Sequence, residues 1–231
     1  MFYRHKFVHN SDSKLFLVSD THFRHDKPFL YEKRGFKNIQ EHDETLIRRW
    51  NETVRPQDHV LHLGDFILGA GQNSEKVAHE ILGQLNGHIG ILWGNHVAGI
   101  STIYKKLVQD LLKCDARDQI EVYPMKYNER ITFLGNQCLA QVKTLTKTHF
   151  VFCSHFAHRV WIDGNKGILS ASGHSHGSDK ESNPDWPHHK RLDVGIENFG
   201  KPLDFDEFLS IMDSKSIQPV DHHDASVNPS F

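Results

Sequence analysis

The sequence predicts an α/β protein in which parallel strands alternate with helices. Three short apolar runs each stop at polar side chains, after Val18, Leu63 and Trp93. Segments with helical spacing of apolar residues separate these runs. Such alternation is typical of parallel strands joined by right-handed crossover connections. Ligands of these sheets bind beyond the carboxyl ends of the strands, so the polar residues that follow each run form the candidate site.

The elements of the first half follow from local patterns. We expect strands over residues 14–18, 59–63 and 89–93. Asn38, with Glu41 three residues later, indicates the start of a helix that Pro56 closes. Further helices are predicted over residues 74–85 and about 100–113. Residues 24–37 are polar and carry Pro28 and Gly35, which predicts a loop over the site.

The second half has a different pattern, with short apolar runs separated by turn residues. Strands in mixed or antiparallel pairing are predicted over residues 119–122, 130–134, 138–142, 149–154, 168–172 and 191–194. A last helix is expected over residues 204–213. Residues 214–231 are polar and lack periodicity, which predicts a flexible tail. Residues 1–213 are therefore interpreted as a single domain.

Composition narrows the possible partners and the compartment. A chain of 231 residues suits one domain with a substantial core. A net charge of −2 argues against a protein that holds extended duplex nucleic acid by its positive field. Three cysteines without CxxC spacing favour neither a disulfide framework nor a cysteine zinc site, which suits a cytoplasmic location. The first residues lack an apolar h-region and no run approaches about 18 apolar residues, so neither a signal peptide nor membrane association is expected.

The polar residues after the three runs are potential metal ligands. Asp20 and His22 are two residues apart, so in extended backbone their side chains leave the strand on the same face and can share one metal ion. The alternative is a turn aspartate beside a surface histidine. Asp65 follows Gly64 and could instead cap a helix or tighten a turn. Asn95 and His96 follow Gly94 and could form an ordinary turn.

Two later segments add histidines to this pattern. His155 ends another apolar run, and it could also be a buried structural histidine. Gly173-His174-Ser175-His176-Gly177 places two imidazoles two residues apart between glycines. Although this could be an ordinary loop, alternating histidines favour metal binding. The order of all five segments is less expected by chance than any one of them.

This ordered set resembles the calcineurin-like metallophosphoesterase superfamily. The flanking residues around Asp20, Asp65 and Asp193-Val194-Gly195 are similar to those of its small bacterial and phage-type members. The resemblance extends from about residue 15 to residue 208. It implies a four-layer α/β/β/α sandwich of two mixed sheets flanked by helices, with a dinuclear metal site at the carboxyl ends of the strands.

The resemblance also implies which residues bind metal. One ion would be held by Asp20, His22, Asp65 and His176, and the other by Asp65, Asn95, His155 and His174. Asp65 would bridge the two. Oxygen and imidazole ligands without thiolate suit divalent transition metals, with manganese favoured over iron, zinc, cobalt or nickel.

Two-metal sites of this kind activate a water as hydroxide, which attacks phosphorus in line with the leaving oxygen. His96 is not needed as a ligand and is therefore the candidate general acid. The superfamily commonly has an acid after this histidine, whereas this chain has Val97. The Asp-Arg-Gly step of the serine/threonine protein phosphatases is also missing, because Phe66 and Ile67 follow Asp65.

Basic and aromatic residues near the motifs are candidate substrate contacts: Arg24, His25, Arg159, Trp161 and Arg191. Each could instead be an ordinary loop residue. The function expected is hydrolysis of a nucleotide-type phosphodiester or a small phosphomonoester. The alternatives are a nuclease that acts on short single strands and a non-catalytic scaffold that keeps the fold.

Overall fold

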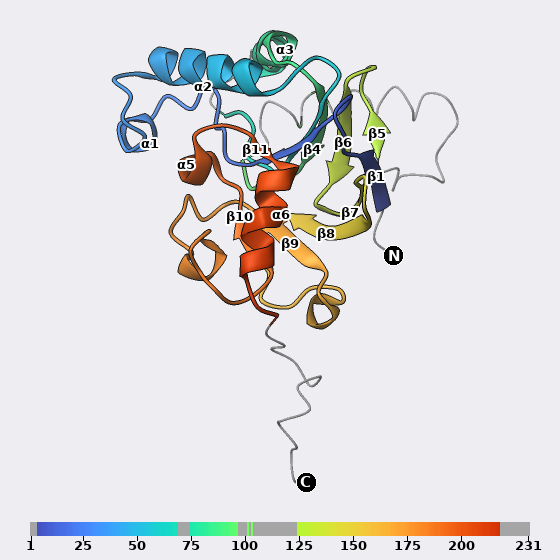
Figure 1. Cartoon of the computed structure of the whole chain (residues 1–231). Helices are drawn as coiled ribbons and strands as arrows, with labels where there is room; N and C mark the ends of the chain where they lie inside the picture. Colours follow the sequence, from blue (N-terminus) through green and yellow to red (C-terminus); the bar gives the residue numbers. More distant parts are fainter. Residues whose placement is uncertain (1–3, 69–73, 97–100, 102, 104–123, 218–231) are drawn as a thin grey trace, which may run out of the picture.

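A computed structural model describes residues 4–68, 74–96, 101, 103 and 124–217. Within these residues the strands form two mixed sheets, one of six strands and one of five, and helices pack against them (Figure 1). This arrangement confirms the predicted α/β class. Among the helices of the described residues, none has both the length and the apolar character needed to cross a membrane.

The six-stranded sheet contains the three strands predicted from the first half of the chain. Its strand order is β11-β2-β3-β4-β6-β5. The strands are β2 (Leu15–Val18), β3 (His59–His62), β4 (His88–Leu92), β6 (Ile131–Gly135), β5 (Met125–Lys126) and β11 (Leu203–Asp204). The four central strands β2, β3, β4 and β6 are parallel, as expected for β2 to β4, and the edge strands β11 and β5 are antiparallel to their neighbours.

The five-stranded sheet has the order β1-β7-β8-β9-β10. Its members are β1 (Arg4–Val8), β7 (Gln137–Lys143), β8 (Thr148–Ser154), β9 (Leu169–Ser172) and β10 (Arg191–Asp193). Only the β7–β8 pair is antiparallel, so the predicted mixed pairing is confirmed. Strand β1 was not predicted, because only Phe7 of its five residues is buried.

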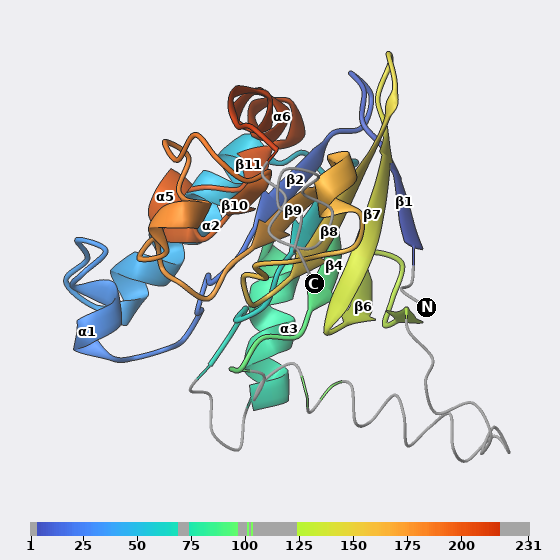
Figure 2. The ribbon, with the colours of Figure 1, turned by 90° about the horizontal axis from the view of Figure 1, so that it is seen from below.

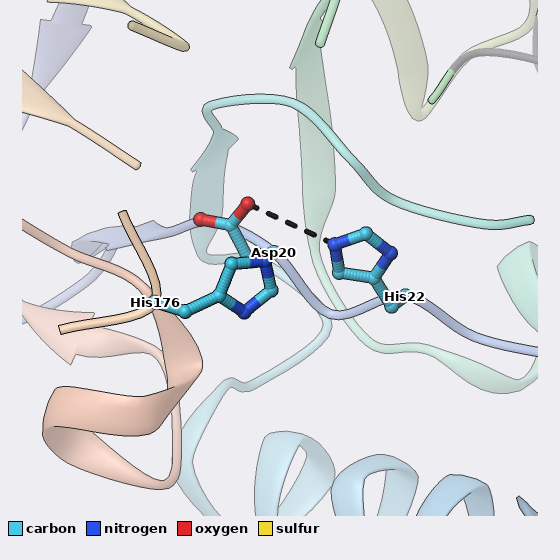
Figure 3. Close-up of side chains that lie close together, drawn as sticks. All are labelled: Asp20, His22 and His176. Atoms are coloured by element: carbon cyan, nitrogen blue, oxygen red, sulfur yellow. Dashed lines mark ion pairs between the residues drawn. The ribbon is translucent and has the colours of Figure 1, made fainter. Parts of the chain in front are cut away.

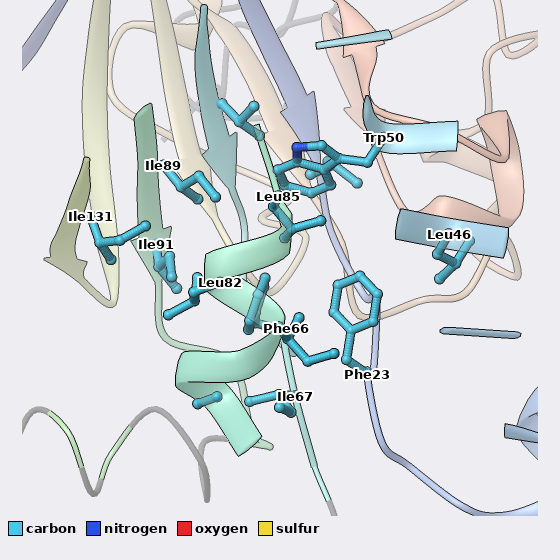
Figure 4. Packing of buried hydrophobic residues seen from close by; sticks show 14 of the residues in the cluster. Phe23, Leu46, Trp50, Phe66, Ile67, Leu82, Leu85, Ile89, Ile91 and Ile131 are labelled. Carbon is cyan, nitrogen blue, oxygen red and sulfur yellow. The ribbon is translucent and has the colours of Figure 1, made fainter. Parts of the chain in front are cut away.

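Two helices cover the outer face of the six-stranded sheet. Helix α2 (Ile39–Thr53) begins where predicted, because the Asn38 side chain accepts the backbone N–H of Glu41. Helix α3 (Ser74–Gln84) lies beside it. Apolar side chains of α2 and α3, such as Trp50 and Leu82, pack on Ile89 and Ile91 of the sheet (Figure 4). This packing holds the carboxyl ends of β2, β3 and β4 in fixed positions.

A second apolar cluster fills the space between the two sheets. It contains Leu17 and Leu61 from one sheet and Val151 and Ala171 from the other. Helix α6 (Phe205–Ser214) contributes Phe205, Phe208 and Met212 to the same cluster. Figure 2 shows α6 beside β11.

Parts of the predicted secondary structure differ from the structure or lie outside the described residues. The predicted loop over residues 24–37 contains the short helix α1 (Pro28–Tyr31), and residues 196–199 form α5 (Ile196–Phe199). The helix predicted at about 100–113 lies outside the described residues except for 101 and 103. The strand predicted over 119–122 is not described, and of the predicted tail only 214–217 is described.

Candidate metal centre

The predicted ligands come together at the carboxyl edge of the parallel strands. Asp20 follows β2, Asp65 follows β3, and His155 directly follows β8. Backbone hydrogen bonds join the segments, since the Asp20 N–H donates to the Gly64 carbonyl at 3.1 Å and the Gly173 N–H to the His155 carbonyl at 2.9 Å. These bonds join the segment after β2 to the segment after β3, and the segment after β9 to the segment after β8.

Many of the candidate ligands have a left-handed backbone. The φ angle is 59° at Asp20, 50° at His22, 54° at Asp65, 68° at His174 and 48° at His176. Residues other than glycine rarely adopt positive φ, and such strain concentrates at functional sites. The tertiary structure therefore holds these five side chains in positions that the local sequence alone would disfavour.

Two glycines allow the ligands to approach closely. A Cβ atom at Gly94 would collide with the side chain and backbone of Asp65, and one at Gly173 would collide with Ser19 and with the Asp20 carboxylate. These glycines carry no chemistry of their own. They are required because the neighbouring chain lies where their side chains would be.

One group of candidate ligands, the first cluster, consists of Asp20, His22 and His176 (Figure 3). One ligand atom from each lies within 4.8 Å of the others. Asp20 and His22 are buried, and neither the Asp20 Oδ1 nor the His22 Nε2 has a hydrogen-bond partner. Buried polar atoms are normally satisfied, so these two facing atoms fit a cation between them.

The second cluster consists of Asp65, His155 and His174, whose ligand atoms also lie within 4.8 Å of one another. The Nε2 atom of His155 lies 2.9 Å from Asn95 Oδ1 and 3.2 Å from His174 Nδ1. Asn95 thus lies beside this cluster, where the sequence placed it. Two groups of oxygen and nitrogen ligands that could each hold a metal ion therefore lie together at this edge of the sheets.

Asp65 lies between the two clusters. Its Oδ2 atom is 3.5 Å from the His22 Nε2 and 3.5 Å from the His155 Nε2. Its Oδ1 atom accepts the backbone N–H of His96 at 2.8 Å. One carboxylate oxygen therefore faces a histidine from each cluster, while the other is held by the segment after β4.

Burial dominates the electrostatics of the first cluster. It raises the pKa of Asp20 from 3.8 to about 7, against the lowering effect of His155 and His176. It lowers the pKa of His22 from 6.5 to about 2, although Asp65 opposes this shift. A metal ligand must be free of its proton. His22 is therefore ready to bind a cation, whereas Asp20 must lose a proton to do so below about pH 7.

In the second cluster, Asp65 and His155 stabilise each other's charged forms. Burial raises the pKa of Asp65, but the hydrogen bond with His155 and the charge of that histidine outweigh burial and lower it to about 2. The same contact raises the pKa of His155, although burial lowers it. The His155 Nδ1 donates to the Leu63 carbonyl at 2.9 Å, which directs Nε2 to the site.

A carboxylate and an arginine orient His176 from behind. The His176 Nδ1 donates to Glu197 Oε1 at 2.5 Å, which leaves Nε2 for a ligand. Arg34 Nε donates to the same oxygen at 3.0 Å. Burial raises the pKa of Glu197, but the contacts with His176 and Arg34 outweigh burial and lower the pKa to about 2. The hydrogen bond to Glu197 also raises the pKa of His176.

Arg34 also supports the backbone of the first motif. Its guanidinium donates to the carbonyls of Asp20 at 2.7 Å and Thr21 at 3.1 Å. It further lies 2.8 Å from the His42 Nε2, while His42 Nδ1 is 2.9 Å from Asp43. The segment after β2 is therefore anchored beneath the site rather than lying loosely over it.

Two further histidines lie beside the first cluster. The His96 ring centroid is 5.3 Å from that of His22, and the His25 ring centroid is 5.8 Å from that of His96. The His25 Nδ1 is 3.3 Å from the His22 Nδ1. Burial and the neighbouring His96 lower the pKa of His25. Val97, which follows the candidate general acid, lies outside the described residues.

Three of the other predicted substrate contacts have partners within the protein. Arg24 Nε lies 3.5 Å from Asp43, and Arg191 is buried in an ion pair with Glu181 at 2.5 Å. The Trp161 indole N–H donates to the Ile168 carbonyl at 2.8 Å, so this ring closes its own loop. Arg159 is exposed on that loop. Of the predicted contacts, the structure brings His25 up against the candidate ligands.

Sequence patterns did not reveal the residues that support the ligands. Arg34 and Glu197 are 163 positions apart, and no spacing rule connects them. Asp193 was noted only as flanking sequence, yet its carboxylate accepts the hydroxyl of Ser175 and the N–H groups of Gly177 and Gly195. Glu197 lies in the first turn of α5, a helix that the sequence patterns did not predict.

Comparison with known proteins supports the fold but indicates no activity. No family model matches the chain. An uncharacterized protein of Methanocaldococcus jannaschii is 47% identical over 83 residues, which are 36% of this chain and 46% of that protein. The match thus spans less than half of the relative. The crystal structure of a protein of unknown function from Aquifex aeolicus has a TM-score of 0.53 and 17% identity, covering 86% of this chain and 99% of that one, so the two share a fold.

Proposed function

We propose that this chain is a metal-dependent phosphoesterase with a dinuclear centre in a four-layer α/β/β/α sandwich. The observation that carries the proposal is the position of Asp65, whose Oδ2 lies 3.5 Å from one histidine of each cluster. One carboxylate that faces two sets of ligands is the geometry that two neighbouring cations require. The buried Asp20 Oδ1 and His22 Nε2, which lack hydrogen-bond partners, support a cation at the first cluster.

The donors fit divalent transition metals. Asp20, His22, Asp65 and His176 would hold one ion, and Asp65, Asn95, His155 and His174 the other. Carboxylate, amide and imidazole ligands favour manganese, while iron, zinc, cobalt and nickel also fit. When bound, two such ions neutralise charge on the phosphoryl oxygens and activate a water molecule for attack.

The remaining residues of the site orient groups and move protons. Glu197 and Leu63 hold His176 and His155 in the tautomers that present Nε2 to the site. Asp65 fixes the His96 backbone, which keeps that imidazole beside the first cluster. We assign His96 the delivery of a proton to the leaving oxygen, because its ring is near the ligands and no cluster uses it.

The proposal is tested by metal content and turnover together. The protein is stripped with a chelator, reloaded with manganese, and analysed for metal by mass spectrometry. Hydrolysis of bis-p-nitrophenyl phosphate and p-nitrophenyl phosphate is then measured beside Asp65→Asn. We expect about two ions per chain by the two-metal scheme and turnover that the variant lacks. Equal turnover by the variant would indicate a contaminating enzyme and contradict the proposal.

The manganese-loaded protein also distinguishes the phosphoesterase from a nuclease and from a non-catalytic scaffold. Cleavage restricted to short single-stranded oligonucleotides, with small diesters untouched, would favour the nuclease. A protein that binds no manganese and hydrolyses nothing would favour the non-catalytic scaffold. A screen of cyclic nucleotides, dinucleotides and sugar phosphates then assigns the substrate class.

A further inference from the structure

Two exposed phenylalanines border the candidate metal centre. Phe29 lies on α1 and is 70% exposed, and Phe156 directly follows His155 and is 50% exposed. An aromatic side chain that is exposed beside a site offers a flat apolar face on which a ligand can stack. Neither residue belongs to the two apolar clusters of the core. Single exposed apolar side chains are common, so what distinguishes these two is their contact with histidines of the candidate metal centre.

Phe156 belongs to the side of the second cluster. Its ring centroid is 5.0 Å from that of His155 and 4.6 Å from that of His174. The plane of the Phe156 ring makes an angle of 73° with the His155 ring and of 60° with the His174 ring. Both histidines are candidate ligands, so a group that binds beside the second cluster would contact this phenyl ring.

Phe29 belongs to the side of the first cluster. Its ring meets that of His25 edge-on, at 89° and a centroid separation of 6.0 Å. The His25 ring is in turn 5.2 Å from that of His22. Contacts thus run from Phe29 through His25 and His22 to Asp65, and from Asp65 through His155 to Phe156. The two phenyl rings are the end members of this row of contacts, and Asp65 joins its two halves.

Both rings are carried on backbone that the fold fixes. The neighbours of Phe29 in α1, Leu30 and Tyr31, are buried. The Phe156 carbonyl accepts the Ser154 hydroxyl at 2.6 Å, at the end of β8. An aromatic surface held in place before binding loses little conformational freedom when a flat group stacks on it.

We propose that the substrate is a phosphodiester that joins two flat aromatic groups, that is, two nucleosides, one stacked on Phe29 and the other on Phe156. This inference rests on the proposed phosphoesterase function and specifies its substrate. The phosphate lies at the middle of the row, where Asp65 faces both clusters, and each base extends toward one ring. Stacking is tolerant of base identity because every base has a flat face. The site therefore selects for two bases rather than for a sequence.

The inference is tested with substrates that carry one base or two. Dithymidine monophosphate has a nucleoside on each side of the phosphate, whereas the methyl esters of thymidine 5′-phosphate and of thymidine 3′-phosphate each keep one. The manganese-loaded wild type is compared with Phe29→Ala and Phe156→Ala. We expect each variant to lose about tenfold or more in kcat/KM for the dinucleotide, mainly through KM. Each should also affect one methyl ester, and not the same one.

Matched variants separate stacking from structure. Phe29→Tyr and Phe156→Tyr keep a flat ring and should retain the dinucleotide preference, whereas Phe29→Leu and Phe156→Leu keep apolar bulk and should lose it. Leu145→Ala removes an exposed side chain at the turn between β7 and β8, and it should leave all three rates unchanged.

The outcomes distinguish this inference from the function on which it rests. Methyl p-nitrophenyl phosphate reports any esterase activity, and no turnover of this or the other diesters would overturn the phosphoesterase proposal and the inference with it. Turnover that the phenylalanine variants do not change overturns the inference alone. Equal losses on all substrates, or losses on the same methyl ester for both positions, also overturn it.

Discussion

Three clusters of histidine and aspartate occur among the described residues, and they differ in whether their polar atoms are already satisfied. The third cluster consists of His9, Asp204 and Asp206 and is similar to the first in composition. It lies at the far end of the sheets, near the start of β2 and of α6. Composition alone would therefore assign a metal ion to both ends of the molecule.

The atoms of the third cluster already have partners. The Leu15 backbone N–H donates to the His9 Nδ1 at 2.9 Å, which leaves the ring proton on Nε2, 3.1 Å from Asp206. Lys14 pairs with Asp204 at 2.6 Å, and Asp204 caps α6. A cation here would have to displace both a proton and a lysine.

In the first cluster the Asp20 Oδ1 and the His22 Nε2 are buried and lack hydrogen-bond partners, although they lie 3.9 Å apart as an ion pair. Leaving buried polar atoms unsatisfied is unfavourable by about 1–3 kcal/mol each, so such atoms persist where a ligand compensates them. Residue types therefore do not separate the first cluster from the third, whereas buried atoms without hydrogen-bond partners do. The following predictions, from the largest expected effect to the smallest, test that difference.

Loss of the shared carboxylate should have the largest effect. Asp65→Asn removes the negative charge between the two clusters. We expect turnover to fall on the order of 10³-fold or more, since groups that act as a unit fail together. Metal content, measured by mass spectrometry, should fall below two ions per chain. Wild-type turnover in this variant would show that Asp65 holds neither ion.

His96→Ala should separate catalysis from metal binding. Removal of a general acid commonly lowers kcat by about 10²–10⁴-fold. Metal content should stay near that of the wild type, because both clusters keep their ligands. Parallel measurements of kcat and bound metal check this prediction. A variant that loses metal would instead place His96 among the ligands.

Glu197→Gln should weaken metal binding without removing a ligand. The carboxylate that orients His176 would become a neutral amide, and the loss of such partners typically weakens metal affinity by about 10–100-fold. Titration of stripped protein with manganese measures this change. Glu181→Gln is the matched control, since Glu181 pairs with Arg191 away from the ligands. Equal losses in both variants would argue for a general effect on stability.

The protonation of Asp20 should make the stability of metal-free protein depend on pH. Burial raises the pKa of Asp20 from 3.8 to about 7, so the folded protein holds this proton more tightly than the unfolded chain. This contribution is complete below about pH 4 and is lost as the pH rises through about 7. The Tm of metal-free wild type, relative to Asp20→Asn, should therefore decline over that window.

Manganese should remove this decline, because the cation takes the place of the proton. His22 has the opposite dependence, since its lowered pKa removes stability as the pH falls below about 6.5. His22 is present in both the wild type and Asp20→Asn, so the difference in Tm between them reports the protonation of Asp20. A difference that stays flat across the window would contradict the assigned protonation.

Asp206→Asn should have the smallest effect. Its side chain is 70% exposed, and ion pairs at such positions contribute about 0–1 kcal/mol to stability. Metal content and turnover should match the wild type, and the change in free energy of unfolding should be within about 1 kcal/mol by chemical denaturation. A clear loss of bound metal would show that the third cluster also holds an ion.

Local patterns predicted the strands that carry the site. The predicted strand 14–18 is Leu15–Val18, and the predicted strand 59–63 is His59–His62. These runs are recognisable because every residue of β2 is buried, which produces an unbroken apolar stretch. The polar residues that end them follow directly in the sequence, so the candidate ligands could be named without coordinates.

What the sequence could not provide depends on contacts between distant segments. Arg34 lies in a stretch predicted to be a loop, and only the folded chain brings it to Glu197 and to the carbonyl of Asp20. Trp161 was predicted to contact the substrate, and only the folded chain shows that its indole N–H is held by the loop that it closes. Phe29 and Phe156 were not predicted as contacts, because an exposed phenylalanine leaves no periodic pattern in the sequence.

The left-handed backbone of the ligands restricts which residues could ever replace them. Aspartate, asparagine and histidine are the side chains, other than glycine, that tolerate positive φ best. They are also common metal ligands. Glutamate or cysteine could supply a donor atom at Asp20, His22 or His176, but would fit the backbone there less well. Few residue types both bind a metal ion and tolerate positive φ. Substitutions at these positions that conserve only the charge should therefore be selected against.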